Sequence, residues 1–159
     1  MKYFEDIVVG EVYRLGQHTF AADEIRAFAA RFDPQRFHLA EAAAAQTHFG
    51  ALCASGWHTA LVWMRLMVDY RRRLAEEARA RGEPVAAIGP ALGFRELKWL
   101  KPVYVGDTID YTSEVVGKRV SNSRPGVGLM TIRATGANRH GEPVISFHST
   151  TFVERRTPS

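Results

Sequence analysis

The segment RFDPQRFHLA, residues 31–40, contains two residues capable of acid–base chemistry, Asp33 and His38, five positions apart. A histidine exchanges a proton near neutral pH, and a carboxylate can orient the ring or accept a hydrogen bond from water. On a continuous helix, side chains five positions apart would point about 140° away from each other. Pro34 follows the aspartate and favours a turn there, which would let the two side chains hold one water molecule.

The same residues also fit a purely structural interpretation. Aspartate followed by proline is a common start of a helix, with the carboxylate as the N-cap and the proline in the first turn. Spacing alone does not decide between a helix cap and a catalytic pair, and both hypotheses stay open.

A second candidate segment is HFGALCASGWHTA, residues 48–60. Ser55 and Gly56 stand at the predicted start of a long helix, where free backbone N–H groups and the helix dipole suit a developing oxyanion such as a thioester enolate. Plain N-capping by Ser55 needs no ligand and can coexist with that role. For Cys53, the only cysteine, a small buried thiol is a commoner outcome than a nucleophile.

Apolar periodicity predicts three helices around these residues. A short helix over residues 21–32 should end before Pro34, and a second helical piece is expected over residues 39–49. The longest pattern begins near Gly56 and should stop at Gly82. Its arginine-rich end should face water, and its predicted core stripe is Trp57, Ala60, Leu61, Met64 and Val68.

The rest of the chain has a composition typical of β-strands. Residues 4–16 predict strand around a Val-Gly turn, and residues 17–20 a short separate strand. After residue 86, turn-forming SNSRPG and NRHGEP segments separate the last three strands, which should be consecutive antiparallel neighbours. A long helix needs a sheet to cover, so a sheet curled around the helix is the simplest architecture. The strand segments in this second half are residues 91–107, 108–120, 126–143 and 144–156.

Composition limits the classes of function. The 159 residues, 46% of them hydrophobic, fit one domain, and no secretory signal pattern opens the chain, so a soluble cytoplasmic protein is expected. The formal charge of +4 is spread along the sequence without a nucleic-acid-binding motif, so neither nucleic acid nor membrane is an expected partner. In residues 70–82, arginines alternate with glutamates, which indicates a solvated helix face; a phosphate-facing patch is the alternative.

Three segments in order resemble the MaoC-like dehydratases, which include the (R)-specific enoyl-CoA hydratases of the hot-dog fold. They are RFDPQRFHLAEAAAA, HFGALCASGWHTA and LKWLKPVYVGDTI. Asp33 and His38 match the family's catalytic aspartate and histidine at the same separation. Phe49-Gly50 matches its Phe-Gly pair, and Gly56 matches the glycine whose backbone lies at the thioester oxygen. The resemblance covers nearly the whole chain.

The chain departs from the family pattern at three places. Pro34-Gln35 replaces the family's Asn-Pro, and Ser55 stands where the family has a histidine before the central glycine. Some hydratases place a serine two turns into the central helix to support the aspartate, and this chain has Met64 there. The acid–base pair is therefore kept, and its supporting residues are altered.

The resemblance implies an α+β fold, a single hot-dog domain over residues 1–155 with an antiparallel curved sheet wrapped around a long central helix, and a frayed tail over residues 156–159. It implies reversible hydration of a trans-2-enoyl-CoA to a 3-hydroxyacyl-CoA by a water that Asp33 and His38 activate. Ser55 and Gly56 would bind the thioester oxygen. Weaker substrate-binding candidates are Gly50, Trp57, His58, Arg95 and Lys98.

The implied reaction needs no metal or other cofactor, because coenzyme A enters with the acyl-CoA substrate. The resemblance also implies a homodimer whose sheets join edge to edge, which would protect the sheet edges. Two alternatives remain: a hot-dog acyl-CoA thioesterase, and a catalytically silent acyl-thioester-binding protein, which the changes at Ser55 and Met64 favour.

Overall fold

A five-stranded antiparallel sheet forms the body of the molecule. The structure, a computed structural model, describes residues 2–156. The strands follow the order β1-β3-β4-β5-β2, so β3, β4 and β5 are consecutive neighbours, as the turn segments predict, and β1 and β2 are the two edges. The five strands are β1 (Val12–Thr19), β2 (Ile88–Trp99), β3 (Thr108–Val120), β4 (Val127–Ala137) and β5 (Pro143–Glu154).

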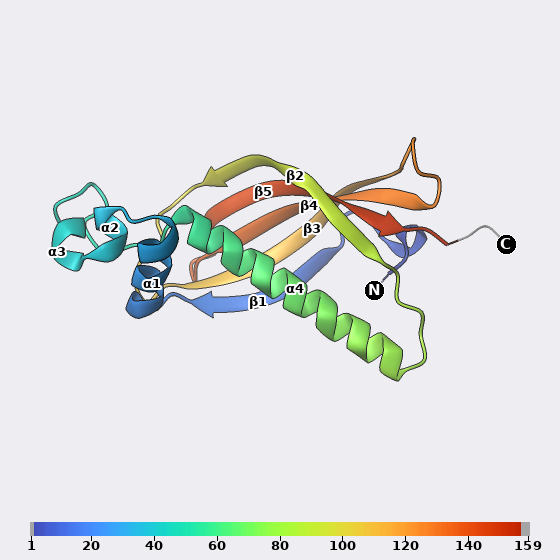
Figure 1. The fold of residues 1–159 in the computed structure, drawn as a ribbon, viewed down its shortest axis with the longest axis horizontal. Helices are drawn as coiled ribbons and strands as arrows, with labels where there is room; N and C mark the ends of the chain where they lie inside the picture. Colours follow the sequence, from blue (N-terminus) through green and yellow to red (C-terminus); the bar gives the residue numbers. More distant parts are fainter. Residues whose placement is uncertain (1, 157–159) are drawn as a thin grey trace.

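The sheet curves around the long helix α4 (Gly56–Ala80), as Figure 1 shows. The helix begins after Ser55, whose hydroxyl accepts a hydrogen bond from the Trp57 backbone N–H at 3.2 Å. It stops before Gly82, whose φ of 69° ends the helical turn, as the sequence predicts. This curved antiparallel sheet around one helix confirms the predicted α+β, hot-dog architecture.

The predicted core stripe of α4 is wrong in part. Trp57, Leu61 and Val68 are about half exposed, at 52%, 51% and 49%. The buried residues of the helix include Val62 and Trp63, which belong to the core beneath the sheet. Because α4 carries apolar residues on two faces, periodicity could not tell which face covers the sheet. The second face remains uncovered in the single chain.

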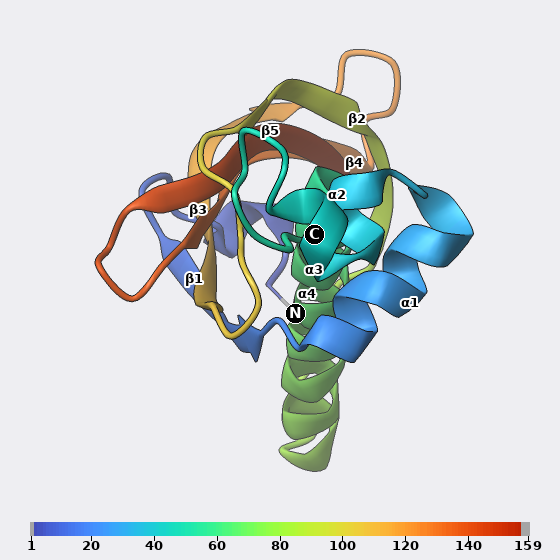
Figure 2. The same cartoon turned by 90° about the vertical axis from the view of Figure 1, so that its left-hand side faces the viewer.

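Three short helices gather at the N-terminal end of α4, as Figure 2 shows. They are α1 (Ala22–Phe32), α2 (Arg36–Leu39) and α3 (Glu41–Ala44). Helix α1 agrees with the prediction, whereas the helix predicted over residues 39–49 is wrong. Ala40 is extended, with φ −140° and ψ 128°, and separates α2 from α3. The Thr47 hydroxyl donates to the Ala44 carbonyl at 2.7 Å, which favours a turn over a further helical turn.

The N-terminal region differs from its prediction in one further way. The two predicted strand segments form the single strand β1, because a bulge between Arg14 and Gly16 lets the strand continue along β3. A 3₁₀ turn, η1 (Phe4–Asp6), precedes it. At the other end of the chain, Arg156 forms an ion pair with Asp6, and residues 157–159 of the predicted tail lie outside the described residues.

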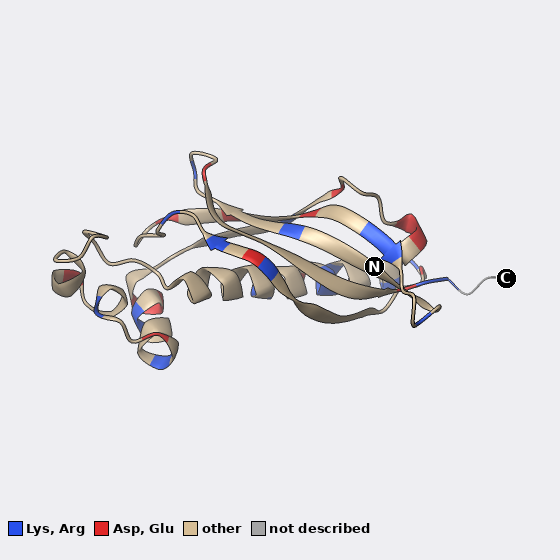
Figure 3. Cartoon of the chain, turned by 90° about the horizontal axis from the view of Figure 1, so that it is seen from above, with Lys and Arg blue, Asp and Glu red and all other residues tan. Residues whose placement is uncertain are grey.

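Positively and negatively charged residues are scattered over the strands and helices, as Figure 3 shows. In the arginine-rich part of α4, Arg72 pairs with Asp69 at 3.0 Å and Arg73 with Glu77 at 3.8 Å. These pairs agree with a solvated helix face. None of the helices within residues 2–156 is long and apolar enough to cross a membrane.

Candidate active site

Asp33 and His38 meet at the turn between α1 and α2. Helix α1 ends at Asp33, whose backbone N–H donates to the Ala29 carbonyl at 2.9 Å. The chain then turns through Pro34, and α2 begins after Gln35. This turn brings Asp33 Oδ2 to 3.4 Å from His38 Nε2. Asp33 therefore closes α1 rather than capping α2, so the helix-start interpretation is wrong and the convergence of the two side chains is observed.

The His38 ring is fixed from behind by the backbone. Its Nδ1 lies 2.7 Å from the carbonyl oxygen of Cys53. Because a carbonyl only accepts, Nδ1 carries the hydrogen, and in the neutral ring Nε2 keeps a free lone pair facing Asp33. The side chain is buried, and the Phe37 ring packs edge-on against it at 4.5 Å between centroids. His38 is thus held in one orientation with its basic nitrogen toward the carboxylate.

The Asp33 carboxylate accepts hydrogen bonds at both oxygens. The Ser55 hydroxyl donates to Oδ2 at 2.7 Å, and the Gln35 amide donates to Oδ1 at 2.8 Å. Burial alone would raise the pKa of Asp33, but these two donors hold it below its ordinary value, and the positive charge of His38 lowers it further when the ring is protonated. Asp33 is therefore ionised at neutral pH.

Ser55 and Gly56 join this pair to the start of α4. As the N-cap, Ser55 accepts from the Trp57 N–H while it donates to Asp33, so one hydroxyl serves both groups. Gly56 is the first helical residue, and a Cβ there would lie 2.4 Å from Trp99 Nε1. Only glycine fits between the helix start and the Trp99 ring, whose indole lies directly over this backbone.

These residues line one cavity of about 450 Å³. Apolar side chains from the α2 region and from the segment after β2 complete its wall, and Tyr104 holds the Phe49 carbonyl at 2.9 Å beside it. The predicted site residues in the lining are Asp33, His38, Ser55, Gly56 and Trp57.

Four weaker candidates do not line this cavity. Gly50 lies in a turn with φ 70°, and only its neighbour Phe49 reaches the wall. His58 is buried, where it pairs with Glu24 at 3.2 Å and stacks on Phe28 with centroids 4.5 Å apart. Arg95 and Lys98 lie on β2 outside the cavity, because the register of this irregular edge strand shifts three times. A substrate-binding role for Gly50, His58, Arg95 and Lys98 therefore stays a prediction, and any such contact would lie outside this cavity.

Sequence reasoning missed Gln35, Trp99 and the Cys53 carbonyl. Gln35 stands two positions after Asp33, a spacing that could have indicated a bond to the carboxylate. Trp99 is 43 positions from Gly56, so no local pattern could reveal its contact. Burial raises the pKa of the Cys53 thiol to about 11, which fits the expected inert thiol, while its backbone oxygen holds His38.

Comparisons with known proteins support one family. A family model described as "MaoC like domain" matches residues 6–138. The crystal structure of the MaoC-like dehydratase from Rhodospirillum rubrum is 33% identical with a TM-score of 0.81, over 99% of this chain and 100% of that one. An R-hydratase from Pseudomonas aeruginosa is 22% identical with a TM-score of 0.66, over 97% of this chain and 86% of that one, which is a likeness of fold.

A mesaconyl-CoA hydratase from Cereibacter sphaeroides is 40% identical over 65 residues, which are 41% of this chain. The match spans only 19% of that relative's length.

Proposed function

Because the chain belongs to the MaoC-like domain family, we propose that it catalyses the reversible hydration of a trans-2-enoyl-CoA to a 3-hydroxyacyl-CoA. The observation that carries the proposal is the Asp33–His38 pair, 3.4 Å apart on one wall of a cavity of about 450 Å³, a volume typical of small-molecule sites. The name of the mesaconyl-CoA hydratase supplies the substrate class. The acyl group itself is left open.

In the proposed step, a water molecule in the cavity contacts both the Asp33 carboxylate and His38 Nε2. His38 takes one proton from the water while the oxygen forms a bond to the β-carbon of the enoyl group. The electrons of the double bond move to the thioester oxygen, and the imidazolium then returns the proton to the α-carbon. Ionised Asp33 orients the water and stabilises the imidazolium, whose other nitrogen already donates to Cys53.

The thioester oxygen needs donors while it carries negative charge. The free N–H groups at the start of α4, around Gly56, are the proposed donors, aided by the helix dipole. Gly56 has no side chain to cover this backbone, and the Trp99 ring packs against it from one side. No proton transfer is required of these groups.

We also propose that a second copy covers the open face of α4. Trp57, Leu61 and Val68 expose apolar surface there, and the edge strand β2 exposes Leu92 and Phe94. Monomeric proteins seldom leave such surface or an unprotected sheet edge to water. A homodimer joined along β2, with the two α4 helices facing each other, would bury both. Arg95 and Lys98 remain candidates for contacts with the phosphates of coenzyme A beyond the acyl cavity.

The test follows the enoyl-thioester absorbance after mixing the protein with crotonyl-CoA and with longer trans-2-enoyl-CoAs. Loss of absorbance with formation of a 3-hydroxyacyl-CoA, and without free thiol, is the expected result. Release of free CoA thiol would instead identify a thioesterase. Saturable binding without turnover would identify the silent binding protein. The Ser55–Asp33 hydrogen bond favours activity over silence, because it supplies the aspartate with support that Met64 cannot give.

A further inference from the structure

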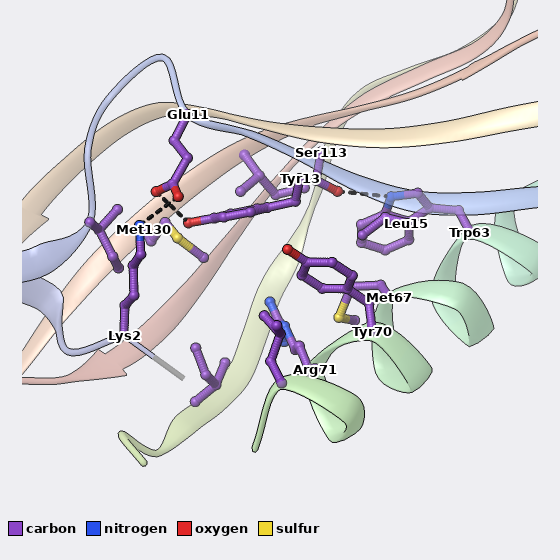
Figure 4. Close-up of a pocket in the computed structure, with 14 residues that line it drawn as sticks. Lys2, Glu11, Tyr13, Leu15, Trp63, Met67, Tyr70, Arg71, Ser113 and Met130 are labelled. Carbon is purple, nitrogen blue, oxygen red and sulfur yellow. Dashed lines mark hydrogen bonds and ion pairs between the residues drawn. The ribbon is translucent and has the colours of Figure 1, made fainter. Parts of the chain in front are cut away.

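A second cavity lies between α4 and the sheet, farther along the helix. Its volume is about 240 Å³, and it shares no lining residue with the Asp33–His38 cavity. Figure 4 shows Trp63 at one end of it and Lys2 at the other. Its volume exceeds the roughly 150 Å³ of engineered apolar cavities that bind benzene. The apolar part of its lining includes Leu15, Met67, Leu74, Ile88, Met130 and Ile132.

Arg71 is the unusual residue of this cavity. Its side chain projects from α4 toward the enclosed space, as Figure 4 shows. Within residues 2–156 it forms no ion pair, whereas the next two arginines, Arg72 and Arg73, pair with Asp69 and Glu77. Burial lowers the pKa of Arg71 from its ordinary value, because the guanidinium loses water without gaining a carboxylate. A partly buried cation of this kind is stabilised by an anion.

The other polar groups that line the cavity do not supply an anion to Arg71, so a ligand can supply it. Glu11 is the one carboxylate in the lining, and it already accepts from Lys2 at 2.5 Å and from the Tyr13 hydroxyl at 3.0 Å. Lys2 and Arg71 outnumber it, so the lining has an excess of one positive charge. Tyr70 adds a hydroxyl near Arg71. The charge of Glu11 is thus compensated, and that of Arg71 is not.

We propose that this cavity binds a free aliphatic carboxylic acid of medium chain length, with its chain among the apolar side chains and its carboxylate on Arg71. The guanidinium can donate two parallel hydrogen bonds to a carboxylate, and a neutral head group cannot accept this charged, paired interaction. Because the two cavities share no lining residue, the acid occupies a site separate from the acyl-thioester site. The inference does not depend on hydratase activity.

The test is a titration of the full chain with octanoate. Calorimetry measures the affinity, and NMR of methionine methyl groups locates the binding site. Signals of Met67 and Met130, which line the cavity, should shift, and that of Met64, which does not, should stay unchanged. Arg71→Gln should weaken octanoate binding about tenfold or more. Arg73→Gln is the matched control, because it removes an exposed arginine two positions after Arg71. This variant should bind octanoate as the wild type does.

The neutral analogue 1-octanol isolates the contribution of the charge. It should bind at least about tenfold more weakly than octanoate to the wild type, and Arg71→Gln should not change its affinity. Arg71→Lys keeps the positive charge and should retain part of the octanoate affinity. It is the test variant to use if Arg71→Gln does not fold. Equal affinity of octanoate and octanol, unchanged affinity in both Arg71 variants, or shifts at Met64 alone would each overturn the proposal.

Discussion

The Ser55 hydroxyl donates a 2.7 Å hydrogen bond to Asp33 Oδ2 while it accepts one from the backbone at the start of α4. The residue that begins the long helix therefore also holds the carboxylate of the candidate pair. Met64, at the place where some hydratases carry a supporting serine, has no hydroxyl to offer. In this chain the support comes instead from the helix cap.

Ser55→Ala removes both bonds. Loss of the N-cap should lower the free energy of unfolding by about 1 kcal/mol. The Ser55 hydroxyl stabilises the ionised form of Asp33, so its loss should raise the Asp33 pKa. As the pH is lowered, hydration activity should therefore fall at a higher pH than in the wild type. A pH–rate profile measures this shift. Ser121→Ala, which removes a turn hydroxyl far along the chain, should leave the profile unchanged; an unmoved acid limb in Ser55→Ala would contradict the assigned bond.

Gly56→Ala places a Cβ 2.4 Å from Trp99 Nε1. The Trp99 ring must move, which should reshape the cavity and lower kcat/KM by roughly tenfold or more, since small misplacements at a reacting centre are costly. Steady-state kinetics with an enoyl-CoA give the value. Gly117→Ala is the control, because a Cβ at Gly117 meets nothing within 4 Å. Equal kinetics for both variants would show that Trp99 does not shape the site.

His58 should affect stability rather than catalysis, because it lies outside the cavity. Burial lowers its pKa despite the Glu24 carboxylate. The unfolded chain therefore binds the proton more readily, so the stabilisation from this neutral histidine is present above pH of about 6.5 and is lost as the pH falls below it. Thermal unfolding of His58→Gln should show a shallower loss of Tm from pH 7 to pH 5 than the wild type.

The exposed His140 provides the matched control for this experiment. His140→Gln should keep the wild-type dependence of Tm on pH. A His58→Gln protein with the wild-type slope would contradict the role given to the buried ring.

Leu61→Asp should shift the protein from dimer to monomer. Leu61 is 51% exposed on the open face of α4, so a charge is tolerated in the monomer and is costly once a second copy covers it. Sedimentation velocity measures the change. Val8→Asp, at an exposed position of the N-terminal segment, should remain a dimer. A monomeric wild type at the concentrations used for kinetics would refute the proposed dimer.

Local patterns predicted the features set by local chemistry. Pro34 indicated the turn that brings Asp33 to His38, and Gly56 and Gly82 marked the two ends of α4. The Ser55–Asp33 bond joins residues 22 positions apart, and no propensity could indicate it. The irregular strand β2 decided that Trp99 lines the cavity while Arg95 does not, because each register shift reverses the face that a side chain occupies.

In the proposed mechanism, Asp33 and His38 act together on one water molecule. The most direct test compares the rate of crotonyl-CoA hydration by wild type, Asp33→Asn, His38→Ala and the double variant, each shown to be folded. Each single change should lower kcat by about 10²- to 10⁴-fold, and the double variant should be little slower than the slower single one, because the residues act as a unit. Single variants that retain the wild-type rate, or losses that simply multiply in the double variant, would contradict the claim.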